Sequence, residues 1–262
     1  MQQEADYRKW RNIQACANIG LMTQKTRTQQ PRRRKKKIDV ASLLEESEAY
    51  FLQVNIPLKL PYTKRLFDIA FSIFALIITT PLWIPSICII SLTSKGSPIF
   101  ISPRVGYGGR PIHCYKLRTM YRDAEKRLKA LLESSPEFAA EYMLRRKLTA
   151  DPRITPIGRF LRRYSIDEIP QFLNVILGAL SVVGPRPYLA RELKELPQPT
   201  LKKLLCVRPG LTGPWQTAGR SNIPFKERVA MEITYSKKRS WKGDLGYIAK
   251  TIPAMLFPKG AL

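Results

Sequence analysis

The segment from Leu66 to Thr93 constrains this chain more than any other part of it. It is 28 residues long and carries one charged side chain, Asp68. A helix needs about 20 consecutive apolar residues to cross the hydrocarbon core of a bilayer, and a core helix of a soluble protein is rarely so long and so uniformly apolar. Pro81 and Pro85 interrupt the segment, and each removes a backbone donor that an α-helix needs. We therefore predict a membrane segment that contains a break.

The residues around this segment leave its topology open. The hydroxyl of Thr80, next to Pro81, can bond a carbonyl that the proline frees. Basic residues lie on both flanks, so the positive-inside rule assigns no orientation to a spanning helix. The same pattern fits a helix that enters the membrane and returns to the same face. The flanking cations are Lys59, Lys64, Arg65, Lys95 and Arg104.

The charge of the chain limits its partners. Its 45 lysines and arginines against 20 aspartates and glutamates give a formal net charge of +25. Such a surface attracts nucleic acid, anionic membranes or phosphate-bearing substrates. Residues 1–60 form a polar extension with six consecutive cations at 32–37. Because an apolar segment follows, we predict that this run binds membrane lipid headgroups, and we expect no nucleic acid. Residues 61–262 are predicted to form one domain.

Histidine and cysteine usage restricts the chemistry. His113 is the single histidine, and we interpret it as structural. The four cysteines are widely spaced and show no metal-ligand pattern. If the chain is an enzyme, carboxylates and cationic groups must carry the reaction. The cysteines are Cys16, Cys88, Cys114 and Cys206.

Beyond the membrane segment, the pattern predicts an α/β domain that is mostly helical and contains a small β-hairpin. The hairpin strands are Ile99–Arg104 and Pro111–Leu117, with Gly108-Gly109 in the turn. The segment 245–256 is apolar enough to be buried or to lie at an interface. Helices are predicted over 123–147, 157–163, 166–177 and 224–238.

An acidic pair is the first candidate for chemistry. Ser165 and Glu168 have the spacing of a capping box, so a helix is predicted to begin there. Asp167 and Glu168 then have two interpretations from the residues alone. They either complement the helix dipole, or they act on phosphorus and hold Mg²⁺, which prefers one or two carboxylates plus substrate phosphates.

Cationic loops are the second candidate. Pro185 and Pro187 restrict the backbone around Arg186, whose guanidinium suits a two-pronged grip on phosphate. The alternative is an ordinary surface loop. Other cation-bearing or glycine-rich stretches could also approach phosphates closely. Their candidate substrate-binding residues are Lys116, Arg118, Arg159, Gln216 and Arg220.

Taken together, these stretches resemble the bacterial sugar transferase family, the monotopic phosphoglycosyl transferases. The similarity covers residues 64–256, with the motifs in family order. The matching stretches include Lys64–Asp68, Tyr115–Met120, Asp151–Thr155, Gly158–Arg163, Asp167–Gln171, Val183–Pro187, Gly210–Gly213 and Gly219–Ser221.

The resemblance implies a compact, membrane-associated domain with one re-entrant N-terminal membrane helix, here over 66–93, at the cytoplasmic face of the bacterial inner membrane. Thr80-Pro81 stands where the family breaks this helix at Ser-Pro, and Pro85 is an additional interruption. The resemblance implies that Asp167 is the nucleophile, that Glu168 is a magnesium ligand, and that Pro185, Arg186 and Pro187 contact substrate.

The implied reaction moves a sugar-1-phosphate from a UDP-sugar to undecaprenyl phosphate, with release of UMP and a covalent aspartyl intermediate. It would initiate exopolysaccharide or glycan assembly. Two alternatives remain. One is a basic, membrane-tethered protein that binds nucleic acid or lipid, and the other is a scaffold with a decayed site. The second is disfavoured because every expected catalytic position is filled.

Overall fold

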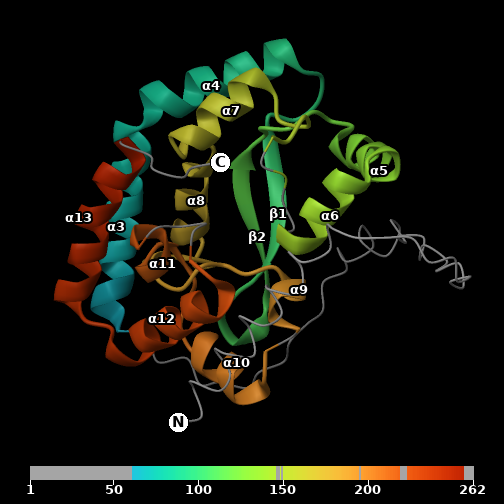
Figure 1. The fold of residues 1–262 in the computed structure, drawn as a ribbon. Coiled ribbons are helices and arrows are strands. Elements are labelled where there is room, and N and C mark those ends of the chain that lie inside the picture. Colours follow the sequence, from blue (N-terminus) through green and yellow to red (C-terminus); the bar gives the residue numbers. More distant parts are fainter. Residues whose placement is uncertain (1–60, 146–147, 149, 195, 219–222, 257–262) are drawn as a thin grey trace, which may run out of the picture. The chain divides into compact units, whose positions relative to one another are not determined.

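A computed structural model describes residues 61–145, 148, 150–194, 196–218 and 223–256. The predicted extension 1–60, with its basic run at 32–37, lies outside the described residues. Figure 1 shows the elements, which in chain order are α3 (Tyr62–Ile78), α4 (Thr80–Thr93), β1 (Ile99–Val105), η1 (Tyr107–Gly109), β2 (Pro111–Leu117), α5 (Ala124–Ser134), α6 (Pro136–Arg145), α7 (Pro156–Arg163), η2 (Ile166–Glu168), α8 (Gln171–Ile176), β3 (Ser181–Val183), α9 (Ala190–Leu193), α10 (Gln198–Leu204), β4 (Gly210–Thr212), α11 (Pro214–Thr217), α12 (Phe225–Lys238) and α13 (Trp241–Leu256).

The predicted hairpin is confirmed. Strands β1 and β2 pair antiparallel, with Ile99 opposite Leu117 and Val105 opposite Pro111. The turn between them is a single 3₁₀ turn in which Gly108 has φ 62°, a left-handed conformation that glycine adopts without strain. Helix α8 packs on β2, the strand that carries Lys116 (Figure 1).

The apolar segment forms two helices with a break between them. Helix α3 ends at Ile78, α4 begins at Thr80, and their axes differ by 63°. The hydroxyl of Thr80 donates to the carbonyl of Leu76 at 2.9 Å, across the break between the two helices. Pro85 lies inside α4 without ending it. Neither helix alone has the length and apolar content of a membrane span, whereas the bent pair meets both criteria.

Polar side chains on α3 join this bent pair to the rest of the domain. Arg65 donates to the carbonyls of Val175 and Ile176 at the end of α8, at 2.5 and 2.7 Å. Buried Asp68 accepts from the hydroxyl of Ser181 at 2.7 Å, on β3. Lys64 bridges Asp68 on α3 and Asp244 on α13, with N···O distances of 3.6 and 2.8 Å respectively. The first turns of α3 are therefore fixed to three other elements.

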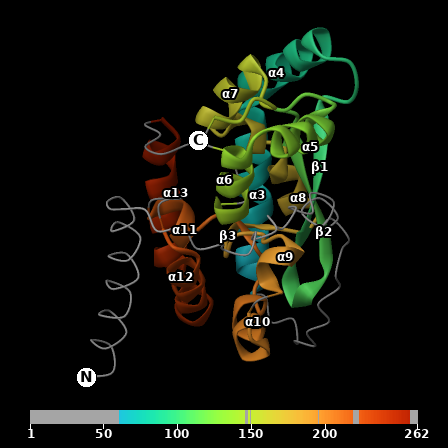
Figure 2. The ribbon, with the colours of Figure 1, turned by 45° about the vertical axis from the view of Figure 1, so that its right-hand side comes forward.

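A second, smaller sheet packs against α3 and α13. Strands β3 and β4 are parallel, with Ser181 opposite Gly210 and Val183 opposite Thr212. Helix α11 packs on both α12 and α13, and α13 also contacts both strands (Figure 2). The sequence did not predict this sheet. The mostly helical character and the small antiparallel hairpin agree with the predicted fold class, and the helices predicted at 157–163 and 224–238 are present as α7 and α12.

Two predicted helices differ in the structure. The helix predicted over 123–147 is two helices, α5 and α6, because the chain turns at Ser135 before Pro136. The helix predicted over 166–177 is a 3₁₀ turn followed by the shorter α8. Pro170 has no amide hydrogen for the carbonyl of Ile166, which accepts from Ile169 at 3.2 Å instead.

Candidate active site

The acidic pair lies on η2, directly after α7. Ser165 adopts a left-handed conformation with φ 57° and makes no side-chain cap, so the predicted capping box is wrong. The carboxylate of Glu168 pairs with Lys116 on β2 instead of returning to Ser165. This pairing replaces the local contact because η2 packs on β2. The two carboxylates therefore lie in a short turn between a strand and two helices, and not in the first turn of an α-helix.

Glu168 is the more accessible carboxylate of the pair. Its Oε1 lies 2.6 Å from Nζ of Lys116, and 47% of its side chain is exposed. Partial burial raises the pKa of Glu168, but Lys116 lowers it by charge and hydrogen bond, and Arg186 and Arg104 lower it further. These cations outweigh burial, so the pKa of Glu168 is below its ordinary value and the group is ionised at neutral pH.

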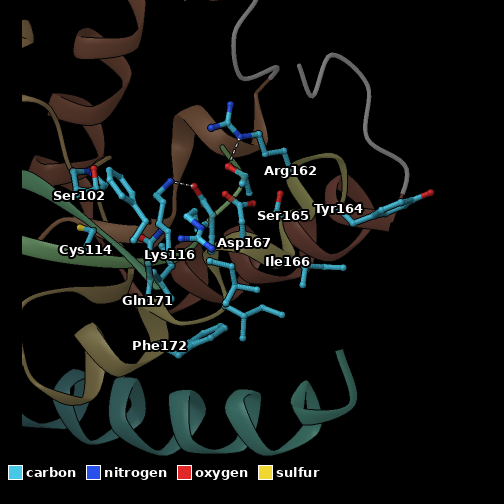
Figure 3. Close-up of a pocket in the computed structure, with 18 of the residues that line it drawn as sticks. Ser102, Cys114, Lys116, Arg162, Tyr164, Ser165, Ile166, Asp167, Gln171 and Phe172 are labelled. Carbon is cyan, nitrogen blue, oxygen red and sulfur yellow. Dashed lines mark hydrogen bonds and ion pairs between the residues drawn. The ribbon is translucent and has the colours of Figure 1, made fainter. Parts of the chain in front are cut away.

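Asp167 has the opposite tendency. Only 7% of the residue is exposed, and burial followed by the negative charge of Glu168 raises the pKa of Asp167 to about 7. Lys116 and Arg162 act against this shift by stabilising the carboxylate. In Figure 3, Asp167 lies between Lys116 and Arg162, and Arg162 donates from Nε to the Thr119 hydroxyl at 2.8 Å. A buried carboxylate that lies between two cations and has a pKa of about 7 is a candidate nucleophile.

The pair opens into a cavity of about 1970 Å³, part of which Figure 3 shows. Its wall has two characters. One part is apolar and comes from α3, α4, α8 and α13, with Phe74, Ile78, Leu82, Phe172 and Ile252 among its residues. The other part is polar and cationic, and includes Ser102, Arg104, Lys116, Arg118, Arg153, Arg162, Arg186, Trp215 and Gln216. The cavity can therefore hold a molecule that has both an anionic and an apolar portion.

The predicted Pro-Arg-Pro element lies beside this cavity. Arg186 and Pro187 line it, whereas Pro185 is buried and its carbonyl accepts from the backbone of Gly210 at 2.7 Å. The guanidinium carbon of Arg186 lies 4.6 Å from the ring centre of Trp215, at cation–π distance. Burial lowers the pKa of the neighbouring Arg104, and the charge of Arg186 lowers it further.

Arg104, Arg162 and Trp215 line the cavity but were not predicted as site residues. Arg104 donates from Nε to the Ser102 hydroxyl at 3.1 Å and from Nη1 to the Pro187 carbonyl at 3.5 Å. All three lie within or beside stretches that resemble the family. Arginine and tryptophan are enriched in binding sites, so the residue types gave a possible signal. Nothing in the neighbouring sequence distinguished these three residues from the other arginines and tryptophans of the chain.

The remaining predicted binding residues are distributed unevenly. Gln216 lines the cavity, and its Nε2 donates to the Leu211 carbonyl at 3.4 Å. Arg118 also lines it, but its guanidinium donates to the carbonyls of Ser94 and Lys95 at the end of α4. Arg159 is exposed on α7 and is not among the lining residues. Arg220 lies outside the described residues. Their roles in binding stay predictions.

The donor set suits magnesium only together with a substrate. Within the described ranges, no group of three or more histidine, cysteine, aspartate or glutamate side chains could hold a metal ion. Glu168 offers one half-exposed, ionised carboxylate at the cavity. Mg²⁺ is commonly held by one or two carboxylates with phosphate oxygens and water completing the shell. Glu168 fits that arrangement when a phosphate-bearing substrate is present.

Comparison with known proteins identifies the family. Residues 60–258 match the family model described as bacterial sugar transferase. The chain is 39% identical over 199 residues to the exopolysaccharide production protein ExoY of Sinorhizobium fredii, covering 76% of this chain and 88% of that protein. It is also 39% identical over 201 residues to the undecaprenyl-phosphate galactose phosphotransferase of Salmonella typhimurium, covering 76% of this chain and 42% of that protein.

A third relative carries a different sugar in its name. The undecaprenyl-phosphate glucose phosphotransferase of Komagataeibacter xylinus is 33% identical over 208 residues, covering 76% of this chain and 36% of that protein. Each of these relatives matches 76% of this chain, and the family match over residues 60–258 includes the acidic pair and the Pro-Arg-Pro element. This chain belongs to the bacterial sugar transferase family.

Proposed function

We propose that this chain transfers a sugar-1-phosphate from a UDP-sugar to undecaprenyl phosphate, releases UMP, and so initiates the assembly of an exopolysaccharide or related glycan. The observation that carries the proposal is the cavity at Asp167 and Glu168, which joins a cationic wall to an apolar one. A nucleotide sugar needs the first wall and a polyprenyl phosphate needs both. Relatives whose names specify undecaprenyl phosphate support the acceptor.

The reaction proceeds in two displacements. A carboxylate oxygen of Asp167 attacks the phosphorus that bears the sugar, the bond between the two phosphates breaks, and UMP leaves with the electron pair. An oxygen of undecaprenyl phosphate then attacks the phosphorus of the aspartyl intermediate. The bond to Asp167 breaks, which regenerates the carboxylate and leaves a sugar-diphospholipid. Splitting one difficult transfer into two displacements is the usual benefit of covalent catalysis.

The cationic wall supplies electrostatic stabilisation. Lys116 holds Glu168 and lies close enough to Asp167 to favour its ionised form. Arg186 grips a phosphate of the UDP-sugar, and Arg104 adds a second guanidinium beside it. Glu168 is the residue that would hold Mg²⁺, which when bound offsets negative charge between the carboxylates and the phosphates. Positioning and charge supply most of the catalysis in phosphoryl transfer.

The bent pair α3–α4 is proposed to enter and leave the inner membrane at its cytoplasmic face. Large apolar side chains are exposed on both helices, among them Leu82 at 52%, Ile78 at 62% and Leu92 at 86%. Many large apolar side chains exposed on two consecutive helices indicate a membrane or protein interface. The apolar wall of the cavity includes Ile78 and Leu82 of the same helices, so a polyprenyl chain in the bilayer has a path to Asp167.

Replacing the proposed nucleophile tests the reaction. Asp167→Asn keeps the shape of the side chain but lacks the attacking carboxylate, so transfer should fall by at least about 10³-fold in a folded protein. The assay measures UMP release from UDP-glucose and UDP-galactose with undecaprenyl phosphate in detergent. Glu133→Gln, an exposed change on α5, should behave as wild type.

The covalent step has its own test. Given a UDP-sugar without lipid acceptor, wild-type enzyme should release no more than one equivalent of UMP and retain the sugar-phosphate on Asp167, detected by mass spectrometry of the intact protein and its peptides. An active Asp167→Asn variant, together with no adduct at this position in the wild type, would exclude the covalent mechanism.

A further inference from the structure

Helix α12 contacts the Pro-Arg-Pro element through a fully buried carboxylate. Glu232 is 0% exposed, and its Oε1 accepts from the main-chain N–H of Arg186 at 3.0 Å. Its Oε2 accepts from the hydroxyl of Tyr188. These two donors lie on either side of Pro187. Glu232 does not line the cavity. Its two hydrogen bonds instead hold the segment from Arg186 to Tyr188 against α12.

One turn earlier on α12, Arg228 lies against Trp215, the same ring that the guanidinium of Arg186 contacts. The guanidinium carbon of Arg228 lies 4.6 Å from the ring centre of Trp215, the same distance as that of Arg186. Arg228 is itself held by a bond from Nη2 to the Ile223 carbonyl at 3.3 Å. Trp215 and Arg186 line the cavity, whereas Arg228 does not.

We propose that Glu232 and Arg228 are positioning residues for Arg186. Glu232 fixes the main chain of Arg186, and Arg228 fixes the Trp215 ring on which its guanidinium rests. A guanidinium fixed before the substrate arrives loses less conformational entropy when it binds a phosphate. The inference rests on the proposed function, in which Arg186 grips the UDP-sugar, and it adds two residues that touch no substrate.

The first test removes the acceptor and keeps the packing. Glu232→Met has a side chain of similar length but cannot accept from the N–H of Arg186, so kcat/KM for the UDP-sugar should fall about tenfold, mainly through KM. Glu232→Gln retains one acceptor oxygen and should keep most of the activity. Glu227→Met, the same change at an exposed position of α12, should match wild type. Equal losses in the Met and Gln variants would overturn the proposal.

A double-mutant cycle with Arg186→Lys separates positioning from a general structural role. Lysine keeps the charge but has no planar fork, so Arg186→Lys alone should lower kcat/KM by about tenfold or more. If Glu232 acts through Arg186, adding Glu232→Met to Arg186→Lys should cost little further activity. Losses that multiply fully would show that Glu232 acts elsewhere. Full activity of Arg186→Lys in an enzyme that Asp167→Asn inactivates would overturn the positioning role and leave the transfer reaction standing.

Arg228 provides an independent route if Glu232→Met does not fold. Arg228→Gln removes the second guanidinium from Trp215 and leaves Glu232 in place, so it should lower kcat/KM by several-fold and lose that effect in the Arg186→Lys background. Lys226→Gln, an exposed cation on the same helix, is the matched control. Circular dichroism and thermal unfolding establish that each variant is folded. An Arg228→Gln effect that persists in full beside Arg186→Lys would overturn the proposal.

Discussion

At the scale of single residues, Asp167 and Glu168 are neighbours in the chain with opposite tendencies to ionise. Burial raises the pKa of Asp167 to about 7, while Lys116 and two arginines hold the pKa of Glu168 below its ordinary value. In the proposed mechanism the buried group attacks phosphorus and the accessible one meets an ion. The difference arises from surroundings, because Lys116 pairs directly with Glu168 at 2.6 Å, whereas the negative charge of Glu168 adds to the effect of burial on Asp167.

The raised pKa of Asp167 predicts an acid limb in the pH profile. Below its pKa the carboxyl is protonated and cannot attack, so kcat/KM for the UDP-sugar should fall as the pH drops below about 7. Lys116 lowers the pKa of Asp167, so Lys116→Met should raise that pKa and move the limb to higher pH. The measurement is UMP release between pH 5 and about 9. Lys129→Met, an exposed change, should leave the limb in place. A limb unmoved by Lys116→Met would count against Asp167 as the titrating group.

Magnesium dependence tests the role of Glu168. A chelator should abolish transfer, and added Mg²⁺ should restore it. Glu168→Gln keeps the size of the side chain but offers no charged ligand. Half-maximal activity should therefore require at least about tenfold more Mg²⁺. The measurement is a Mg²⁺ titration of UMP release. Glu133→Gln should give the wild-type titration, and an unchanged titration for Glu168→Gln would remove this residue from the metal site.

At the scale of elements, the sequence predicted those helices and turns that are determined by residues close together in the chain. The hairpin around Gly108-Gly109, α7 and α12 follow from turn residues and periodicity. The capping box at Ser165 failed because Glu168 found an ionic partner on another element, which no local pattern reveals. The parallel pair β3–β4 escaped prediction because each strand has only three residues, too few for a period.

Close packing between α7 and the end of the hairpin gives an element-scale prediction. A Cβ at Gly158 would lie 2.0 Å from the Thr119 carbonyl oxygen, so Gly158→Ala must displace α7 from the segment that holds Arg162. We expect a loss of stability of about 2 kcal/mol or more, measured as a lower melting temperature in detergent. Gly246→Ala, on α13 with nothing within 4 Å of the added Cβ, should be neutral or stabilise by up to about 1 kcal/mol. Equal melting temperatures for the two variants would show that α7 adjusts freely.

At the scale of the whole molecule, the candidate site combines residues that are far apart in the sequence. Asp167, Glu168 and Arg186 were predictable because they stand in recognisable motifs. Arg104 and Trp215 were not, since their proximity to Arg186 exists only after β1 and α11 pack against the loop between β3 and α9. The sequence motifs thus indicated the acidic pair and Arg186, whereas the other residues around them are determined by tertiary packing.

Polar contacts join both ends of the bent pair α3–α4 to the rest of the domain. Lys64 and Asp68 hold the start of α3 against Asp244 and Ser181, and Arg118, directly after β2, donates to two carbonyls at the end of α4. Both ends of the pair are therefore fixed to the same domain, which is compatible with a segment that enters and leaves the membrane on one face. A spanning segment would have to place its two ends on opposite faces.

Single cysteines placed on the two flanks distinguish these topologies. In a background without Cys16, Cys88, Cys114 and Cys206, Leu60→Cys and Ser97→Cys are labelled with a membrane-impermeant maleimide in intact cells and in inverted vesicles. Both should react only in inverted vesicles, because a re-entrant pair keeps both flanks in the cytoplasm. Activity of each variant, measured by UMP release, controls for folding. Labelling of one position in intact cells and of the other in inverted vesicles would require a spanning helix. That outcome would contradict the bonds that join Arg65 of α3 to α8 and Arg118 to the end of α4.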